Sequence, residues 1–370
     1  MQIIEFASGT LRFLDAVPQQ PPADGFVWIY LDREALHGEL PKLQQAVQRL
    51  GGSSLLDLHV QDLENPAHPS HYDYTSIYDL VIFRRLATAA EVDAELKAAD
   101  GAPAAPAPDA LAAFRRIRTR AVAFVVFDRL LVTVHPGGCF TARSFIKRFL
   151  ADAVQSDGLE VASRSRLPTG PSDQMLRMIN VMVDSYLELR KQLSAEMDRW
   201  QQELLRPRSE SADWNALMLA RAQLHTLEDL CEEQNDAMQE WLDTAQEQPA
   251  PALAQAERDS LVARARDVIE HIQRVAQQVR RMEQAAETAV QIHFSAQSHR
   301  TSNIMRTLTA LTAIFLPLNL ITGFFGMNFE FLPLLHSAAA MWVVLGVMLV
   351  VAFTVALVFW RKRYLARTGR

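Results

Sequence analysis

The sequence predicts three kinds of segment in order: a mixed α/β domain, a long helical segment, and two membrane-spanning helices. Runs of Val, Ile, Phe and Tyr bounded by turn residues lie within residues 1–165. Apolar residues at helical spacing fill residues 166–303, and two long uncharged apolar runs lie within residues 304–370. We therefore expect an α/β domain, a helical stalk and a transmembrane hairpin over these three ranges.

Within the first range, three segments rich in β-forming residues predict strands. They are Phe26–Asp32, Ser76–Leu86 and Ala121–Pro136, the last of which we expect to turn back at Asp128-Arg129. Residues 38–52 predict an amphipathic helix that closes on two glycines. The Pro- and Ala-rich residues 99–113 predict a surface loop.

The second range predicts helices of unusual length. Between residues 172 and 300 there is no glycine, and proline occurs only at positions 207, 249 and 251. Residues 174–204 and 214–242 predict two helices. A third, from about residue 252 to 325, meets no Gly or Pro before Pro317 and is expected to continue into the first membrane span. A helix this long is typical of a coiled or bundled stalk.

The third range predicts two membrane spans, at about residues 304–325 and 338–360. Leu308–Phe325 has 18 residues without a charge, and Ala338–Trp360 has 23. About 20 apolar residues cross a bilayer, and uncharged runs this long are rare in soluble domains. The short link predicts a hairpin. Arg300 and Arg306 before the first span, and the basic tail from Arg361, predict that both flanks and both termini are cytoplasmic.

The composition excludes several classes of function. The net charge of −6 argues against a nucleic-acid-binding protein. The first residues lack the basic and apolar regions of a signal peptide. No P-loop, nucleophile elbow or dinucleotide fingerprint is present, so we do not expect an enzyme. The two cysteines, Cys139 and Cys231, lie far apart and predict buried reduced thiols.

A group of histidines allows two interpretations. Three histidines and two aspartates occur close together, namely His59, His68, His71, Asp62 and Asp73. Such residues can hold zinc. Histidines without a metal are the preferred interpretation.

The first predicted span has a polar stripe. Alternating steps of four and three residues join Met305, Thr309, Thr312, Leu316, Asn319 and Gly323, so they share one helical face. An amide facing lipid would be costly, so Asn319 should face protein or water. The stripe fits either helix packing or a pore wall, and from the stripe alone packing is preferred.

The last 110 residues carry a specific resemblance. The stretch MRTLTALTAIFLPLNLITGFFGMNFEFLP ends its span with Gly326-Met327-Asn328 and resembles the first span and loop of the CorA family of magnesium transporters. Weaker likenesses to the same family lie in LLDLHVQDLEN, LLVTVHP and RDVIEH. The resemblance therefore extends over most of the chain.

The resemblance implies a funnel-shaped homopentamer in a bacterial inner membrane, with its long helix continuous with the first span. It implies a divalent cation channel that takes up Mg²⁺, with Mg²⁺ also as a regulatory ion. Co²⁺, Ni²⁺ or Zn²⁺ are further candidate ions. The expected partners are further copies of the chain, the lipid bilayer and divalent metal ions.

The resemblance also implies roles for particular residues. Gly326, Met327 and Asn328 would form the selectivity filter, and Glu330 would attract cations. The pore would be lined by Met305, Leu308, Thr309, Thr312, Leu316, Asn319 and Gly323, with Met305, Leu308 and Leu316 as apolar constrictions. Asp267 would bind a regulatory metal together with an acid of the α/β domain, for which Glu91, Asp93 and Glu95 are candidates. The family often has a second acid in the loop, where this chain has Leu334.

Two other functions remain as alternatives. The related ZntB branch transports zinc and often has Gly-Val-Asn at the filter, so Met327 favours magnesium. A membrane-anchored scaffold would need no polar stripe, and this chain has one.

Overall fold

The computed structural model describes residues 1–370 apart from 8–9, 89–90, 93–112, 115–116, 138, 140–144, 148–166, 205–213, 248–254, 328–337 and 362–370. The chain divides into two compact units, Met1–Glu287 and Thr288–Arg370. Each unit is described by itself below.

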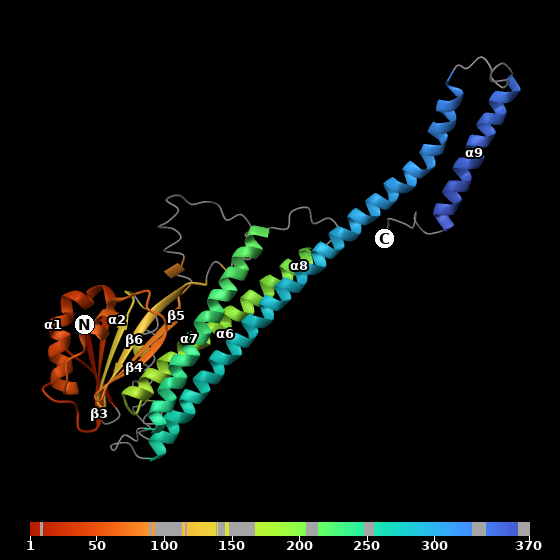
Figure 1. Ribbon diagram of the computed structural model, residues 1–370. Helices are drawn as coiled ribbons and strands as arrows, with labels where there is room; N and C mark the ends of the chain where they lie inside the picture. Colours follow the sequence, from red (N-terminus) through yellow and green to blue (C-terminus); the bar gives the residue numbers. More distant parts are fainter. Residues whose placement is uncertain are drawn as a thin grey trace. The chain divides into compact units, whose positions relative to one another are not determined.

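The first unit is built on one mixed sheet of seven strands (Figure 1). The strands are β1 (Gln2–Ala7), β2 (Thr10–Leu14), β3 (Gly25–Asp32), β4 (His71–Tyr74), β5 (Asp79–Leu86), β6 (Thr119–Val126) and β7 (Leu130–His135). Their order is β2-β1-β3-β7-β6-β5-β4. Only the β3–β7 pair is parallel among the described strands, with Val27 opposite Leu130 and Asp32 opposite His135.

The strands expected from β-forming runs are confirmed as β3, β5, β6 and β7. The turn at Asp128-Arg129 is also confirmed, since the Phe127 amide donates to the Leu130 carbonyl at 2.8 Å. Three strands, β1, β2 and β4, were not predicted from the sequence. They lie at or near the two edges of the sheet and are only four to six residues long. Strands this short contain too few alternating apolar and polar residues to be recognised in the sequence.

Helices cover both faces of the sheet (Figure 1). α1 (Arg33–Gly51) and α2 (Asp57–Glu64) pack on the face that carries alternate apolar residues such as Val27, Ile29 and Leu31. α1 ends, as predicted, at a glycine: Gly52 has φ of 84°, a left-handed conformation that few other residues adopt. α6 (Pro171–Leu204) and α7 (Trp214–Glu247) contact strands of the other face.

Buried polar contacts join α6 and α7 to the sheet. The backbone carbonyl of Arg84 on β5 accepts hydrogen bonds from the Tyr186 hydroxyl of α6 at 2.8 Å and from the Gln234 amide of α7 at 2.7 Å. The same amide donates to the Tyr186 oxygen at 3.1 Å. One carbonyl of the sheet therefore fixes both helices.

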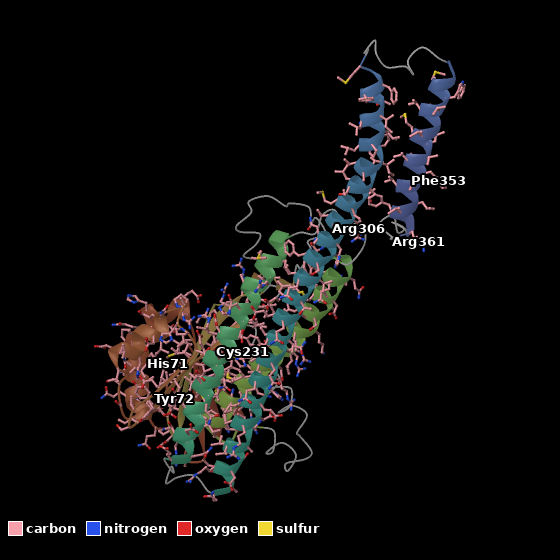
Figure 2. All side chains as sticks on the ribbon, turned by 45° about the vertical axis from the view of Figure 1, so that its right-hand side comes forward. His71, Tyr72, Cys231, Arg306, Phe353 and Arg361 are labelled. Atoms are coloured by element: carbon pink, nitrogen blue, oxygen red, sulfur yellow. The ribbon has the colours of Figure 1, made fainter. Side chains whose placement is uncertain are left out.

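The predicted long helix is α8, at Gln255–Phe325, which has 71 residues. In the first unit it is fixed to both neighbouring helices by ion pairs. Arg264 lies 2.8 Å from Asp173 of α6, and Arg280 lies 2.5 Å from both Glu228 and Glu232 of α7. Apolar residues of the three helices are buried between them, as is Cys231 (Figure 2).

The second unit is a helical hairpin. It contains the C-terminal part of α8 and α9 (Ala338–Arg361), which lie side by side and antiparallel (Figure 1). Among the described residues, α8 and α9 are the two helices long and apolar enough to cross a membrane. The fold class predicted from the sequence is thus confirmed for the single chain.

A carboxyl group between the sheet and α7 should make the stability of the first unit depend on pH. Burial, together with the smaller effect of the charge of Asp128, raises the pKa of Asp79 on β5 to about 6, whereas hydrogen bonds from Tyr72 and Trp241 favour the ionised form. The Tyr72 hydroxyl donates to Asp79 Oδ1 at 3.4 Å. The folded chain thus holds this proton at a pH where the unfolded chain has released it, so stability falls as pH rises from about 4 to about 6.

We predict that Asp79→Asn removes this fall. Its free energy of unfolding at about pH 8 should exceed that of the unaltered chain by about 1–3 kcal/mol, and the gap should close towards about pH 4. Denaturant unfolding followed by tryptophan fluorescence measures both values. Asp15→Asn, at an exposed site on the described surface, is the control and should change neither. An Asp79→Asn variant with the same pH dependence as the unaltered chain would contradict the assignment.

Candidate functional site

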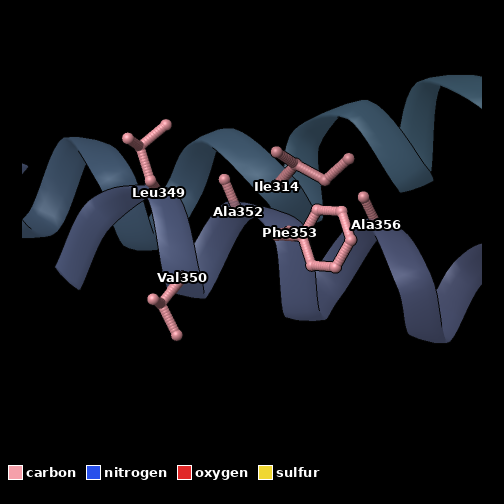
Figure 3. Close-up of a pocket in the computed structure, with 6 residues that line it drawn as sticks. All are labelled: Ile314, Leu349, Val350, Ala352, Phe353 and Ala356. Atoms are coloured by element: carbon pink, nitrogen blue, oxygen red, sulfur yellow. The ribbon is translucent and has the colours of Figure 1, made fainter. Parts of the chain in front are cut away.

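The C-terminal part of α8 has one face directed towards α9. Ala310 is only 1% exposed, and Ile314, Pro317, Ile321 and Phe325 on the same side are half-buried. Figure 3 shows Ile314 of α8 beside α9, where it lines an apolar groove together with Leu349, Val350, Ala352, Phe353 and Ala356. This face of α8 is therefore the packing face of the hairpin.

The predicted polar stripe lies on the opposite face of α8. Thr312 precedes Ile314 by two residues, which places the two side chains about 200° apart around the helix. The residues predicted to line a pore are all exposed in the single chain, namely Met305, Leu308, Thr309, Thr312, Leu316, Asn319 and Gly323. α9 therefore does not cover the stripe, so packing between the two spans of one chain does not explain it.

The threonines of this stripe keep acceptor capacity on the exposed face. Thr309 Oγ1 donates to the Met305 carbonyl at 2.8 Å, and Thr312 Oγ1 donates to the Leu308 carbonyl at 2.9 Å. Each hydroxyl thereby satisfies its one proton within the helix and leaves oxygen lone pairs to accept from outside. Asn319 adds an amide oxygen to the same face, and a Cβ at Gly323 would meet no atom within 4 Å.

Exposed side chains of α9 differ from this stripe. Its large exposed apolar residues are Met341, Trp342, Val343, Leu345, Val347, Leu349, Val350, Phe353, Leu357 and Val358, and the exposed Arg361 ends the helix. Such a surface suits lipid, whereas a face of hydroxyl and amide groups does not. The two helices of the hairpin are thus chemically distinct on their outer sides.

α8 ends at the predicted filter triplet. The Gly326 amide donates to the Thr322 carbonyl at 2.9 Å, and the Met327 amide donates to the Phe324 carbonyl at 3.3 Å. Asn328, Glu330 and Leu334 lie outside the described residues. Gly326 does not have a left-handed backbone conformation, since the described glycines with positive φ are Gly25 and Gly52.

A different constraint acts on Gly326. A Cβ there would lie 3.0 Å from the Thr322 carbonyl oxygen, which is closer than ordinary van der Waals contact. A larger residue would therefore press on the last hydrogen-bonded turn of α8, directly below the triplet.

The predicted regulatory residue, Asp267, lies on α8 in the first unit. Its side chain is 56% exposed, and Oδ1 lies 3.7 Å from Nε2 of His271, one turn further along α8. The other ring nitrogen of His271, Nδ1, lies 3.8 Å from Oδ1 of Asp184 on α6. The imidazole therefore lies between two carboxylates at ion-pair distance but beyond hydrogen-bonding distance.

Sequence reasoning missed Asp184 and His271. His271 lies four residues after Asp267 and so shares its helix face, which is a signal that could have been used. Asp184 lies far away in the sequence, in a helix with many solvated charges, and only the packing of α6 against α8 reveals it. No three His, Cys, Asp or Glu side chains converge on a metal position among the residues described. A metal at Asp267 would therefore need ligands from elsewhere, such as another copy.

Of the acids considered as partners of Asp267, Asp93 and Glu95 lie outside the described residues. Glu91 is engaged elsewhere: its carboxylate accepts from Arg85 at 2.6 and 2.9 Å and from the Thr88 amide at 2.7 Å. Burial alone would raise the pKa of Glu91, but these hydrogen bonds lower it below its ordinary value. These contacts argue against Glu91 as a metal ligand.

The histidine group does not form a zinc site in the part of the chain that the structure describes. His59 on α2 is buried, with Nδ1 2.8 Å from the Tyr78 hydroxyl and Nε2 3.1 Å from Asp73 Oδ2, so both nitrogens are engaged. His68 pairs with Asp62 at 3.3 Å. His71, labelled in Figure 2, opens β4. Its ring lies 5.9 Å from that of His68.

Comparisons with known proteins agree on one family. The family of CorA-like Mg²⁺ transporter proteins matches residues 23–363. The cobalt/magnesium transport protein CorA of Thermotoga maritima is 29% identical over 189 residues, which are 51% of this chain and 51% of that protein. CorA of Methanocaldococcus jannaschii is 34% identical over 74 residues, which are 20% of this chain and 23% of that protein. The chain therefore spans about half the length, or less, of these curated relatives.

Similar solved structures cover nearly the whole chain. The complete structure of the CorA magnesium transporter from Methanocaldococcus jannaschii has a TM-score of 0.70 at 17% identity, and covers 100% of this chain and 98% of that one. The full-length CmaX protein has a TM-score of 0.62 at 16% identity, with coverage of 98% and 97%. At these identities the similarity is one of fold.

We predict that Ala310→Phe destabilises the hairpin. The Cβ of Ala310 lies in the buried seam of the second unit, so a phenyl ring there must separate the helices, at a cost of about 1–3 kcal/mol. Leu311→Phe, at the neighbouring exposed position, is the matched control and should have little effect. Thermal unfolding of both variants in detergent measures the difference, and equal unfolding temperatures would mean that this face is not the packing face.

Proposed function

The chain belongs to the family of CorA-like Mg²⁺ transporter proteins, and from this membership and the geometry of α8 we propose that it conducts Mg²⁺ across a membrane. The observation that carries the proposal is the stripe of hydroxyl and amide groups on the face of α8 that α9 leaves open. The stripe leads along the helix to Gly326-Met327-Asn328. No catalytic role is assigned to any residue.

The path would lie between copies of the chain. One helix cannot enclose an ion, so the stripe becomes a pore wall only when several α8 helices surround a common axis, as in the homopentamer that the family resemblance implies. The outer sides of α9 would then face lipid. Thr309, Thr312 and Asn319 would present neutral oxygens towards the axis, where they can accept hydrogen bonds from the water that Mg²⁺ retains.

Selection would take place at the outer end of α8. Asn328 would place a ring of amide oxygens there, supported by the Gly326 carbonyl and by Met327. Because Mg²⁺ loses its water reluctantly, neutral acceptors suit a hydrated ion better than a tight carboxylate cage. Glu330 would raise the local cation concentration without binding the bare ion. Leu334, where a second acid would stand, weakens that attraction.

Closure would come from the apolar members of the stripe. Met305, Leu308 and Leu316 are large, apolar and exposed on the single chain. Rings of such side chains close a pore by excluding water. They alternate along α8 with the polar members, so the same face can both carry and block an ion.

Regulation would act through Asp267. Its carboxylate, with Asp184 nearby and His271 between them, has the oxygen donors that Mg²⁺ prefers, and the exposure of Asp267 leaves it accessible to a second copy. A metal shared between copies would favour the closed arrangement, and its loss would shift the population towards the open one.

The setting would be a bacterial inner membrane with both termini in the cytoplasm. Arg300, Arg306 and Arg361 lie at the same end of the hairpin, as the positive-inside rule requires for cytoplasmic flanks. An inside-negative potential then drives a divalent cation inwards with about 2 × 2.3 kcal/mol per 100 mV. No nucleotide is needed for uptake.

Other ions are the second candidates. The name of the Thermotoga maritima relative includes cobalt, which supports Co²⁺ as a further cargo, and Ni²⁺ and Zn²⁺ would use the same path. Met327 favours magnesium over the zinc-transporting ZntB branch. A purely anchoring hairpin is disfavoured, because an anchor has no use for the polar stripe.

We predict that Asn328→Ala lowers Mg²⁺ influx into liposomes that contain the purified chain by roughly tenfold or more, because the amide ring is lost. Asn303→Ala is the matched control. Asn303 lies nine residues before Thr312, about half a turn from the stripe, and its loss should leave influx unchanged. Unchanged influx in Asn328→Ala would remove Asn328 from the filter.

We also predict that Asp267→Ala weakens inhibition by internal Mg²⁺, so that roughly fivefold more is needed to halve the influx. Glu270→Gln serves as the control, since Glu270 pairs with Arg274 on its own helix at 2.5 Å rather than with α6. Influx measured against internal Mg²⁺ gives both values. Inhibition of the Asp267→Ala variant at the same concentration as the unaltered chain would show that the sensor lies elsewhere.

A further inference from the structure

An exposed aromatic residue precedes the first membrane span. Between Thr288 and Asn303, α8 is mostly small and polar, yet two large apolar side chains are exposed there: Phe294 is 57% exposed and Ile292 is 46% exposed. Both lie in the second unit and on the same uninterrupted helix as the polar stripe. Neither residue lies within the two membrane spans predicted from the sequence.

Phe294 lies in register with the proposed constrictions. Met305 follows it by 11 residues, and Leu316 follows Met305 by another 11. Eleven residues are about three turns, so each step returns to within about 20° of the same face. Met305 is 58% exposed and Leu316 is 69% exposed, much as Phe294 is. No Gly or Pro lies between Phe294 and Met305 to alter this register.

The residues between these positions repeat a second pattern. Ser298 and Thr301 lie on the shared face between Phe294 and Met305, as Thr309 and Thr312 lie between Met305 and Leu316. All four are exposed. The face therefore alternates between one large apolar side chain and a pair of hydroxyls, and the alternation begins at Phe294, before the membrane span.

Ile292 does not share this face. It precedes Phe294 by two residues, which turns its side chain about 200° away. Two exposed apolar residues of similar size thus lie on opposite sides of one helix, and only Phe294 is aligned with Met305. The ring of His293 meets that of Phe294 edge-on, with centroids 6.2 Å apart.

We propose that Phe294 forms a further apolar constriction of the ion path, on the cytoplasmic side of the membrane and about 16 Å from Met305 along α8. This inference rests on the proposed function. Phenyl rings gathered at the axis exclude water and oppose the passage of a hydrated divalent cation. The hydroxyls of Ser298 and Thr301 line a wet chamber between Phe294 and Met305, so an ion crosses two separate closures.

The flux experiment uses the full chain in liposomes with high internal Mg²⁺, where the path is closed. Phe294→Ala should raise the residual Mg²⁺ influx by roughly three- to tenfold, and Phe294→Leu should keep it low, because closure depends on an apolar side chain of sufficient size. Ile292→Ala, the matched control, should leave it unchanged. Equal influx in Phe294→Ala and the unaltered chain, or an equal rise in Ile292→Ala, would overturn the proposal.

Cross-linking separates this proposal from the proposed function. The native Cys139 and Cys231 are buried, so a mild oxidant should join only introduced thiols. Phe294→Cys should form disulfides between copies in the membrane, and Ile292→Cys should not. If the unaltered chain carries no Mg²⁺, the proposed function fails, while cross-linking at Phe294→Cys alone still supports its place at the axis. If the chain conducts and Phe294→Cys does not cross-link, the constriction at Phe294 is wrong and the transport function stands.

Discussion

The structure depends on the hydrogen bonding of one helix backbone, that of α8. Inside a bilayer no water can satisfy a free amide or carbonyl, so a span must remain helical along its length. α8 meets this requirement as one element of 71 residues. Pro317 is its one internal exception: it lacks an amide proton, which leaves the Ala313 carbonyl without its usual donor.

Because the backbone is otherwise satisfied internally, the side chains of α8 are free to differ around its circumference. One face packs on α9 and the other carries hydroxyl and amide groups.

The same helix carries both of the proposed sites. Asp267 lies on the part of α8 that packs against α6 and α7, and Met305 begins the stripe 38 residues later. A long helix bends gently but does not easily break without Gly or Pro, and none occurs between these two residues. The ion pairs of Arg264 and Arg280 attach the first part of α8 to two helices that are themselves fixed to the carbonyl of Arg84 on the sheet. In the proposed function, a metal at Asp267 would act on this helix and not on an isolated side chain, as coupling between sites requires.

Elements with long periodic patterns could be predicted from the sequence, and features that depend on tertiary contact could not. The long helix and the four central strands repeat their apolar residues often enough to identify the element, whereas β4 has only four residues. The stripe was visible in the sequence, but only the packing of Ala310 towards α9 shows which face remains open. The approach of Asp184 to His271 joins residues that no local pattern relates. The constraint on Gly326 could not be predicted from the sequence, because a glycine can be required for space as well as for conformation, and the 3.0 Å approach to Thr322 appears only in the folded structure.

The distribution of charge along α8 suits two different tasks. The sequence has no Asp or Glu between Glu287 and Glu330, so the stripe, and the part of α8 from Phe294 that precedes it, are free of carboxylates. In the proposed function, a sensor must hold its ion long enough to shift a population, and carboxylates such as Asp267, with Asp184 on α6, would provide that affinity. A path must release each ion quickly, and conduction needs sites weak enough to leave. Neutral oxygens on Thr309, Thr312 and Asn319 would meet that need for an ion that keeps its water. Weak sites alone would leave the path open, and it is the large apolar side chains between them that allow it to close. In the proposed function, the separation of carboxylates from the path would thus allow one metal ion to be both the cargo and the signal.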